Sequence, residues 1–230
     1  MKRFYEKAET VPATGGHGIA LDGRLVKTPG RNDLIVPSLA LAAAVAAEWD
    51  AQQGEIRREA MPLTRLAGAT IDRSAAQREA IVRQVAHYAG TDLVCYRAAH
   101  PPALAARQHA GWQPLIDWVA ERYNTLLVVT TGVVPTSQPA ASLAAFVAVV
   151  AAHDDFQLTA LHAATTACGS LVIALALLEG RLDAGEAFAA AQLDESFQIE
   201  AWGEDAEQAE RRAALAADIE AAAQFISLLA

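Results

Sequence analysis

The sequence contains little cysteine and few aromatic residues. Its two cysteines, Cys95 and Cys168, lie far apart in apolar surroundings, and neither belongs to a Cys-x-x-Cys pair. This excludes a thiolate framework for zinc, and we expect two buried free thiols in a reducing compartment. Aromatic residues make up 6% of a chain that is 53% hydrophobic, because alanine supplies much of the apolar content. Alanine-rich runs favour helix, so we expect a largely helical chain that needs no disulfide.

Targeting and membrane-spanning segments are also missing. The N-terminal sequence MKRFYEKAET has no apolar run behind its basic residues, which argues against a secretory signal or a transit peptide. Two uncharged stretches, 124–152 and 156–178, contain prolines or polar residues and lack flanking Lys and Arg. Uncharged stretches that are interrupted by prolines and polar residues are more typical of buried helices than of membrane spans. We therefore expect a cytoplasmic protein with no membrane insertion.

Positive charge is scarce at the C-terminal end. The net charge is -9, and residues 182–230 contain eleven carboxylates against Arg211 and Arg212, so the first 181 residues carry no net charge. An acidic end of this kind repels phosphate backbones and anionic lipid surfaces. We therefore expect no nucleic-acid partner, and a basic protein surface is the better candidate.

The first forty residues have the pattern of short strands. The segment GHGIALDGRLVKTPG places Asp22 and Gly23 between two apolar stretches, which predicts a hairpin with a type I′ turn. Residues 32–37 predict a third short strand. Together these strands predict a small antiparallel sheet and a first domain over residues 1–38.

From Ser38 onward the pattern is helical. Ser38 is a suitable cap for the first helix, and Ser74 with Gln77 forms a capping box. The fold class is therefore predicted to be α+β, with a small N-terminal antiparallel β domain followed by a larger all-helical C-terminal domain over residues 39–230. Two segments, 91–98 and 125–134, are ambiguous between extended and other structure. Helices are predicted at 39–53, 61–72, 74–88, 100–108, 112–123, 140–152, 155–179, 183–201 and 206–229.

The sequence gives little support for catalysis. The glycines of TGGHGIALDG open a hairpin and not a helix, so they do not form a phosphate-binding loop. Histidines and carboxylates cluster only at 153–162, where Asp155 and His162 are two helical turns apart and unsuited to one metal. We expect His162 to be a core histidine bonded to a backbone or threonine partner. Neither cysteine has a base beside it, and we expect no metal and no cofactor.

The segment LDESFQIEAWGED, residues 193–205, carries five carboxylates and two aromatic residues. On a helix, Glu195, Gln198 and Trp202 stand close together. A carboxylate, an amide and an indole suit an anchor for a basic, partly apolar protein surface better than acid–base catalysis. The alternative is that Trp202 closes the helical core while the carboxylates form a solvated face. Gly203 is expected to end this helix and Asp205 to cap the next one.

Several blocks, in the order in which they occur, resemble a known family. The order is similar to that of the assembly chaperones for the alpha subunit of the ATP synthase catalytic sector, known from mitochondria and alphaproteobacteria. The resemblance covers nearly the whole chain. Its first block begins within five residues of Met1, so we expect no presequence and hence an alphaproteobacterial member. The blocks are RFY, LDGRLVKTP, AAEWDAQ, MPLTRLA, TDLVCYRA, RQHAGWQPLIDW, LHAATTACGSLVIALAL and LDESFQIEAWGED.

The resemblance implies a small β-rich domain joined to a helical domain, no enzymatic activity, and the ATP synthase alpha subunit as partner. The resemblance also implies that the chain holds newly made alpha subunit through the surface that later pairs with beta. Glu195 matches the family's functionally sensitive glutamate, and Phe197 stands where a larger aromatic is expected. The family's acidic partner-binding block falls on Asp194, Glu195, Gln198, Trp202, Gly203 and Asp205.

The leading hypothesis is therefore a monomeric assembly chaperone that is not an enzyme. An alternative is a small-molecule hydrolase that uses the acidic cluster at 194–205 together with His162, which requires these groups to converge on one cavity. A second alternative is a membrane-associated helical protein built on residues 124–178.

Overall fold

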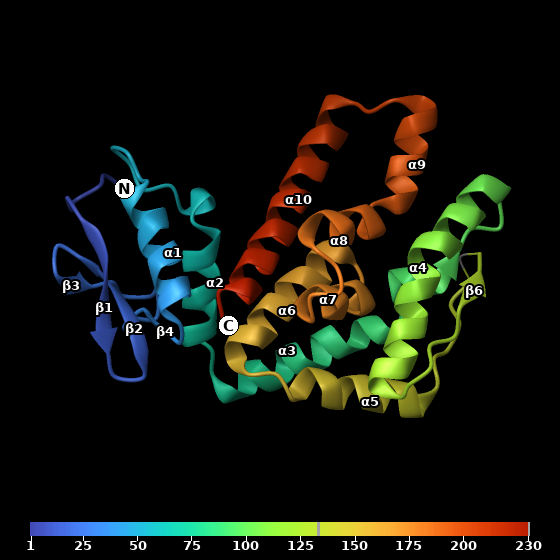
Figure 1. Cartoon of the computed structure of the whole chain (residues 1–230), viewed down its shortest axis with the longest axis horizontal. Helices are drawn as coiled ribbons and strands as arrows, with labels where there is room; N and C mark the ends of the chain where they lie inside the picture. Colours follow the sequence, from blue (N-terminus) through green and yellow to red (C-terminus); the bar gives the residue numbers. More distant parts are fainter. Residues whose placement is uncertain (133, 230) are drawn as a thin grey trace.

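The computed structural model describes residues 1–132 and 134–229 (Figure 1). Its N-terminal part holds a 4-stranded sheet of β1 (Ala8–Ala13), β2 (Gly16–Leu21), β3 (Arg24–Leu25) and β4 (Ile35–Val36). Each of the other strands pairs antiparallel with β2. Asp22 and Gly23 have φ of 47° and 79°, the positive values that a type I′ turn requires. The predicted hairpin and third strand are confirmed.

The sequence interpretation missed β1. This strand pairs with β2 along its whole length, from Ala8 opposite Leu21 to Ala13 opposite Gly16. Its sequence, AETVPA, contains a charged residue and Pro12 and lacks the clear apolar alternation by which strands are recognised. Proline is tolerated here because β1 is an edge strand. Pairing with β2, more than local propensity, makes this segment a strand.

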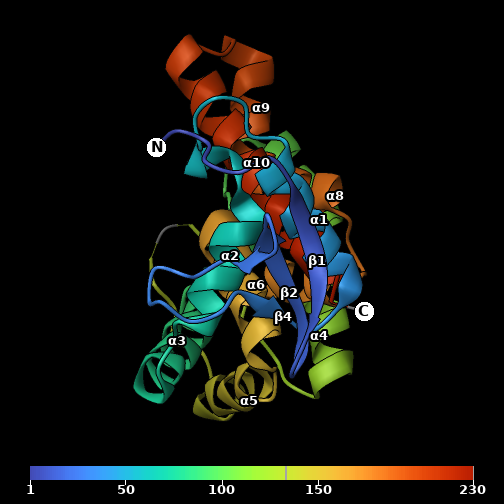
Figure 2. The same cartoon turned by 90° about the vertical axis from the view of Figure 1, so that its left-hand side faces the viewer.

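The helix α1 (Leu39–Asp50) packs on the sheet, and α2 (Pro62–Ile71) packs on α1 (Figure 2). The side chain of Ser38 accepts a hydrogen bond from the N–H of Leu41 at 3.0 Å, which confirms the predicted cap. Ile19 of β2 belongs to the same hydrophobic cluster as Val45 of α1 and Ala67 of α2. The domain boundary at residue 38 stays a prediction, and the core of the sheet draws on residues well beyond it.

The rest of the described chain is mainly helical, so the α+β fold class is confirmed. Short 3₁₀ turns occupy Arg58–Ala60, Tyr88–Gly90 and Leu93–Cys95. The ambiguous segments contribute β5 (Tyr96–Arg97) and β6 (Thr130–Thr131), which pair in parallel. The helices are α3 (Ala75–His87), α4 (Pro102–Tyr123), α5 (Ala140–Ala151), α6 (Asp155–Cys168), α7 (Leu171–Leu178), α8 (Ala184–Ala191), α9 (Leu193–Trp202) and α10 (Ala206–Ser227).

Helix α7 lies at the centre of the helical part. Every residue from Leu171 to Ala176 has 0% exposure, and α4, α6, α8 and α10 all contact this helix. Cys95 and Cys168 belong to the same hydrophobic cluster, and both thiols are free and buried, as predicted. Within the described residues, no helix combines the length and the apolar character needed to cross a bilayer.

Two predicted helices are each divided in the structure. The helix predicted at 155–179 breaks at Gly169, which has φ of 64°, and restarts after Ser170. The helix predicted at 183–201 breaks at Gln192, between α8 and α9. Conversely, the two helices predicted between 100 and 123 form the single helix α4, with Pro114 in its interior. The first break has a local cause, since Gly169 ends α6 in the left-handed conformation and Ser170 caps α7. The break at Gln192 has no side-chain cap to mark it.

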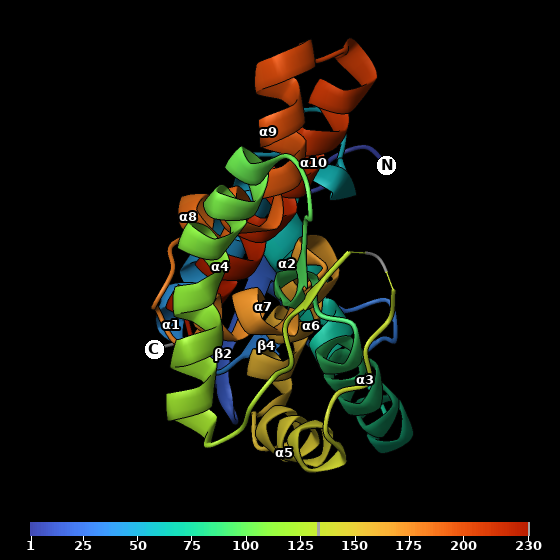
Figure 3. The ribbon, with the colours of Figure 1, turned by 90° about the vertical axis from the view of Figure 1, so that its right-hand side faces the viewer.

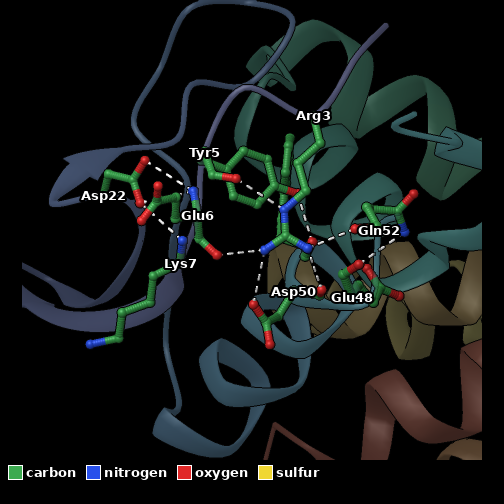
Figure 4. Close-up of polar contacts among 9 residues, drawn as sticks. Arg3, Tyr5, Glu6, Lys7, Asp22, Glu48, Asp50 and Gln52 are labelled. Carbon is green, nitrogen blue, oxygen red and sulfur yellow. Dashed lines mark hydrogen bonds and ion pairs between the residues drawn. The ribbon is translucent and has the colours of Figure 1, made fainter. Parts of the chain in front are cut away.

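Arg3 fastens the N-terminal segment to the end of α1 (Figure 4). Its guanidinium donates to the carbonyls of Tyr5, Glu6, Asp50 and Gln52 at 2.6–3.0 Å. The C-terminal carbonyls of a helix lack partners within the helix and carry partial negative charge, so a cation is favourable there. The RFY block therefore has a structural role in the sheet end of the molecule.

A buried carboxylate supports the start of α7. Asp92 is fully buried and accepts hydrogen bonds from Ser170 Oγ at 2.5 Å and from the N–H of Val172 at 3.1 Å. It also accepts one from the N–H of Val94, so it joins the 3₁₀ turn at 93–95 to α7. Burial raises the pKa of Asp92 to about 6, although these hydrogen bonds oppose the rise.

We predict that Asp92 makes stability depend on pH. An unfolded aspartate has a pKa of about 3.9, so between about pH 4 and pH 6 the folded chain binds more protons than the unfolded chain. The contribution of Asp92 to the free energy of unfolding therefore falls as pH rises through that window. Denaturant unfolding of wild type and Asp92→Asn at pH 4.5 and pH 7 measures this contribution.

The difference in the free energy of unfolding between wild type and Asp92→Asn should change by about 1–3 kcal/mol over this range. Glu121→Gln, which removes an exposed carboxylate of α4, serves as the control and should follow wild type. A difference that stays constant with pH would contradict the prediction.

Candidate partner-binding site

The acidic segment forms a helical hairpin that projects from the body. We call residues 193–212, which comprise α9, the following turn and the first part of α10, the arm. In Figures 1, 2 and 3 the arm rises above the other helices. Only Leu193 of α9 is buried, and it belongs to the core cluster around α7. The arm is therefore rooted at Leu193, with Phe197 packed partly against the core, and is more exposed toward its tip.

Gly111 of α4 leaves room for Leu193, the first residue of the arm. A Cβ atom added at Gly111 would lie 3.0 Å from Leu193 Cδ1, closer than ordinary contact. A larger residue at position 111 would push α9 away from α4. The absence of a side chain at Gly111 thus sets how closely α9 lies beside the N-terminal half of α4 (Figure 3).

Two polar contacts fix the orientation of α9 on α4. Arg107 donates to both carboxylate oxygens of Glu200 at 2.7 Å each, a paired geometry that is stronger than a single contact. This hydrogen bonding holds the pKa of Glu200 below its usual value. Nearer the root, the buried side chain of Gln108 donates to Asp194 at 2.7 Å. Asp194 and Glu200 are therefore engaged within the chain.

Arg212 of α10 joins the two helices of the arm. It donates to Gln192 at 3.1 Å and to Ser196 at 3.2 Å, and it forms an ion pair with Glu204 at 3.1 Å. Its guanidinium also lies 5.1 Å from the ring centroid of Phe188. These contacts come from α8, α9 and the turn, so Arg212 holds the hairpin closed.

Three of the six predicted partner-binding residues have roles within the chain. Asp194 bonds Gln108, as described above. Gly203 ends α9 with φ of 83°, and its N–H donates to Ile199 at 2.8 Å. Asp205 caps α10 by accepting from the N–H of Gln208 at 2.8 Å. The predicted helix end and cap are confirmed, and these three residues shape the arm.

The other three residues share one exposed face of α9. Glu195, Gln198 and Trp202 are spaced i, i+3 and i+7, and all three are exposed. No side-chain hydrogen bond or ion pair within the described residues involves any of them. Trp202 is 88% exposed, so the alternative that it closes the helical core is wrong. We call Glu195, Gln198 and Trp202 the α9 face.

Charge on the arm is partly neutralised. The arm contains seven carboxylates and two arginines. Glu204 pairs with Arg212 and Glu207 with Arg211, while Glu200 pairs with Arg107 of the body. The Glu207–Arg211 pair is fully open to solvent, so it contributes little stability and is screened by salt. The carboxylate of Glu195 therefore lies unpaired on the same face of α9 as the exposed indole of Trp202, two turns away, on an arm that remains net negative.

The structure does not gather the groups that the hydrolase alternative needs. His162 lines a groove between α2, α6 and α10, and neither Asp194 nor Glu195 lines that groove. Burial lowers the pKa of His162, which keeps the ring neutral. Its Nε2 atom is buried without a hydrogen-bond partner in the described chain, so the predicted backbone or threonine bond is wrong for that atom.

Metal coordination has no obvious place in the described residues. No group of three His, Cys, Asp or Glu side chains lies together there in a way that suits an ion. The contacts that orient the arm, from Arg107, Gln108 and Arg212, were not found from the sequence. Arg107 and Glu200 are 93 positions apart, and no local pattern relates them.

The comparisons with known proteins agree on one family. Residues 2–120 match the family model described as ATP12 chaperone protein. The protein atp12, mitochondrial, from Schizosaccharomyces pombe is 25% identical over 221 residues, which span 90% of this chain and 76% of the relative.

Solved structures extend the agreement to the whole fold. The crystal structure of Atp12 from Paracoccus denitrificans is 41% identical with a TM-score of 0.94, over 100% of this chain and 98% of the other. The Atu1473 protein from Agrobacterium tumefaciens is 38% identical with a TM-score of 0.94, over 100% of this chain and 86% of the other. A family model that covers more than half of the chain and a relative above 40% identity lead to one conclusion: the chain belongs to the ATP12 chaperone family.

Proposed function

We propose that this chaperone binds the unassembled alpha subunit of the ATP synthase catalytic sector and shields its subunit interface until beta pairs with it. Members of the ATP12 family are ATP synthase assembly chaperones. We assign the alpha subunit as the client, and we assign the first contact to the α9 face. Cytoplasmic location and the monomeric state remain predictions.

The observation that carries this proposal is the exposure of Trp202. A tryptophan that is 88% exposed contributes almost nothing to the fold, whereas tryptophan is among the residues that dominate binding energies at interfaces. Glu195 and Gln198 lie on the same face of α9 with no partner in the described chain, so they are free to meet a basic or polar group. The arm thus offers an apolar anchor next to a negative charge.

Shielding of this kind needs binding and no turnover. A chaperone that binds only the unassembled subunit stabilises it by mass action, in proportion to its concentration and affinity. Release follows when beta occupies the same surface more tightly. The proposal therefore requires neither nucleotide nor a catalytic group, and it assigns this chain no enzymatic activity.

We predict that Glu195→Lys weakens capture of the alpha subunit by about tenfold or more, because the reversed charge repels the basic group that Glu195 meets. Tagged chaperone and alpha subunit are co-expressed, and the recovered alpha subunit is titrated. Circular dichroism should be unchanged, since Glu195 is exposed. Glu121→Lys makes the same charge change on an exposed site of α4 and should capture normally. Equal capture by both variants would remove Glu195 from the site.

We predict that Trp202→Ala weakens the same interaction by about 1–2 kcal/mol, which corresponds to a loss of roughly 5-fold to 30-fold in affinity. The free energy of unfolding should change by less than about 0.5 kcal/mol, because the ring is exposed. Leu126→Ala, which removes a 70% exposed side chain outside the arm, is the control. Full affinity of Trp202→Ala, or its failure to fold, would contradict the prediction.

A further inference from the structure

A cavity lies beside α2, at the end of the molecule away from the arm. Its volume is about 350 Å³, at the small end of the range for binding pockets, which suits one large apolar side chain better than a folded surface. We call this cavity the α2 pocket. Its apolar walls come mainly from Val26, Pro29, Leu34, Ile56 and Met61.

Gly68 forms part of the α2 pocket, although packing does not require a glycine there. The residue lies inside α2, where glycine costs about 1 kcal/mol relative to alanine. A Cβ atom added at this position would meet only Pro29 Cδ, at 3.8 Å, which is ordinary contact. Gly111, by contrast, lies against Leu193. Gly68 therefore keeps the wall of the pocket open and is not needed for close helix packing.

The free charges at the rim of the α2 pocket are positive. Arg58 and Arg65 are exposed, and neither forms an ion pair within the described residues. The carboxylate at the rim, Asp72, is engaged by Thr28 at 2.5 Å, by the N–H of Gly30 at 2.7 Å and by Asn32 at 2.9 Å. An occupant that brings its own carboxylate would therefore find two unpaired guanidinium groups.

The groove that His162 lines lies on the other side of α2 from the α2 pocket. Its volume is about 490 Å³, and it lies between α2, α6 and α10. Arg65 and Ala69 line both the α2 pocket and this groove. They are one helical turn apart and both exposed, so they form a ridge between two apolar hollows. Figure 1 shows α2 between the sheet and the lower end of α10.

We propose that this face across α2 is a second docking surface for the client, and that it takes a polypeptide segment with a large apolar side chain next to a carboxylate. The apolar side chain enters the α2 pocket, and the carboxylate meets Arg65 on the ridge. This inference rests on the proposed function, because the occupant is a segment of the same alpha subunit that the α9 face binds.

The two surfaces differ in the charge that they require. The α9 face presents an unpaired carboxylate and selects a basic region, whereas the ridge and the pocket rim present the unpaired Arg65 and Arg58 and select an acidic one. A client with both features would be held in one orientation, since reversing it would place like charges together. Two weak contacts on one rigid body also bind more tightly than either contact alone.

Two variants of the full chain test this proposal: one fills the α2 pocket, and the other reverses the charge of Arg65 on the ridge. Gly68→Leu places an apolar side chain in the α2 pocket, and Arg65→Glu removes the cation. Ala80→Leu and Arg83→Glu introduce the same new side chains at exposed positions of α3, where Arg83, unlike Arg65, pairs with Glu79 at 3.8 Å. We expect at least about fivefold weaker capture of the alpha subunit by both test variants and normal capture by both controls. Melting temperature establishes that each variant is folded, and Arg65→Glu alone decides the matter if Gly68→Leu fails to fold.

A photo-crosslinking amino acid in place of Ala69 identifies the occupant directly. It should label an alpha-subunit peptide in which a large apolar residue adjoins Asp or Glu, and the same probe at Ala80 should not. If wild type and the controls capture alpha subunit and the test variants match them, this inference is wrong while the proposed function stands. If wild type captures no alpha subunit, the proposed function fails. Native mass spectrometry that finds a bound small amphiphile in the pocket would also overturn the inference.

Discussion

The burial of α7 is the constraint on which the rest of the helical part depends. An apolar helix without solvent contact needs partners on every side, and α4, α6, α8 and α10 supply them. Its first N–H groups also need acceptors inside the core, where unpaired groups are costly. Ser170 caps the helix and Asp92 completes the cap from a distant part of the chain. Once α7 is enclosed, the directions of α8 and α10 are set, and α9 follows α8.

The arm owes its shape to contacts that are few and separate in sequence. Gly111 admits Leu193, Arg107 holds Glu200, and Arg212 closes the hairpin. These contacts use part of the acidic block for structure and leave the α9 face unoccupied. A binding protein has to keep some favourable groups unsatisfied in its free state. Glu195, Gln198 and Trp202 on one end, and Arg58 and Arg65 on the other, meet this condition in the described chain.

Much of the fold was predictable where local chemistry determines it. The Asp22-Gly23 turn, the Ser38 cap and the Ser74 capping box need only neighbouring residues, and all three formed as expected. Strand β1 and the breaks at Gly169 and Gln192 were not predicted. Pairing decides the strand, Gly169 and Ser170 mark the first break locally, and an edge strand with a proline or an alanine-rich helix gives little periodic signal.

The sequence by itself determined that the chain has a small sheet followed by helices, and that an acidic helix with one tryptophan ends near a glycine. Periodicity, capping residues and charge are local properties, so they can be read directly from the chain. Only the tertiary structure decided which carboxylates of that helix are engaged and that Trp202 faces solvent. It alone also revealed the α2 pocket, because its walls come from the segment between β3 and β4, the end of α1, the turn before α2 and α2 itself. Exposure and cavities depend on contacts between residues far apart in sequence, which no local pattern specifies.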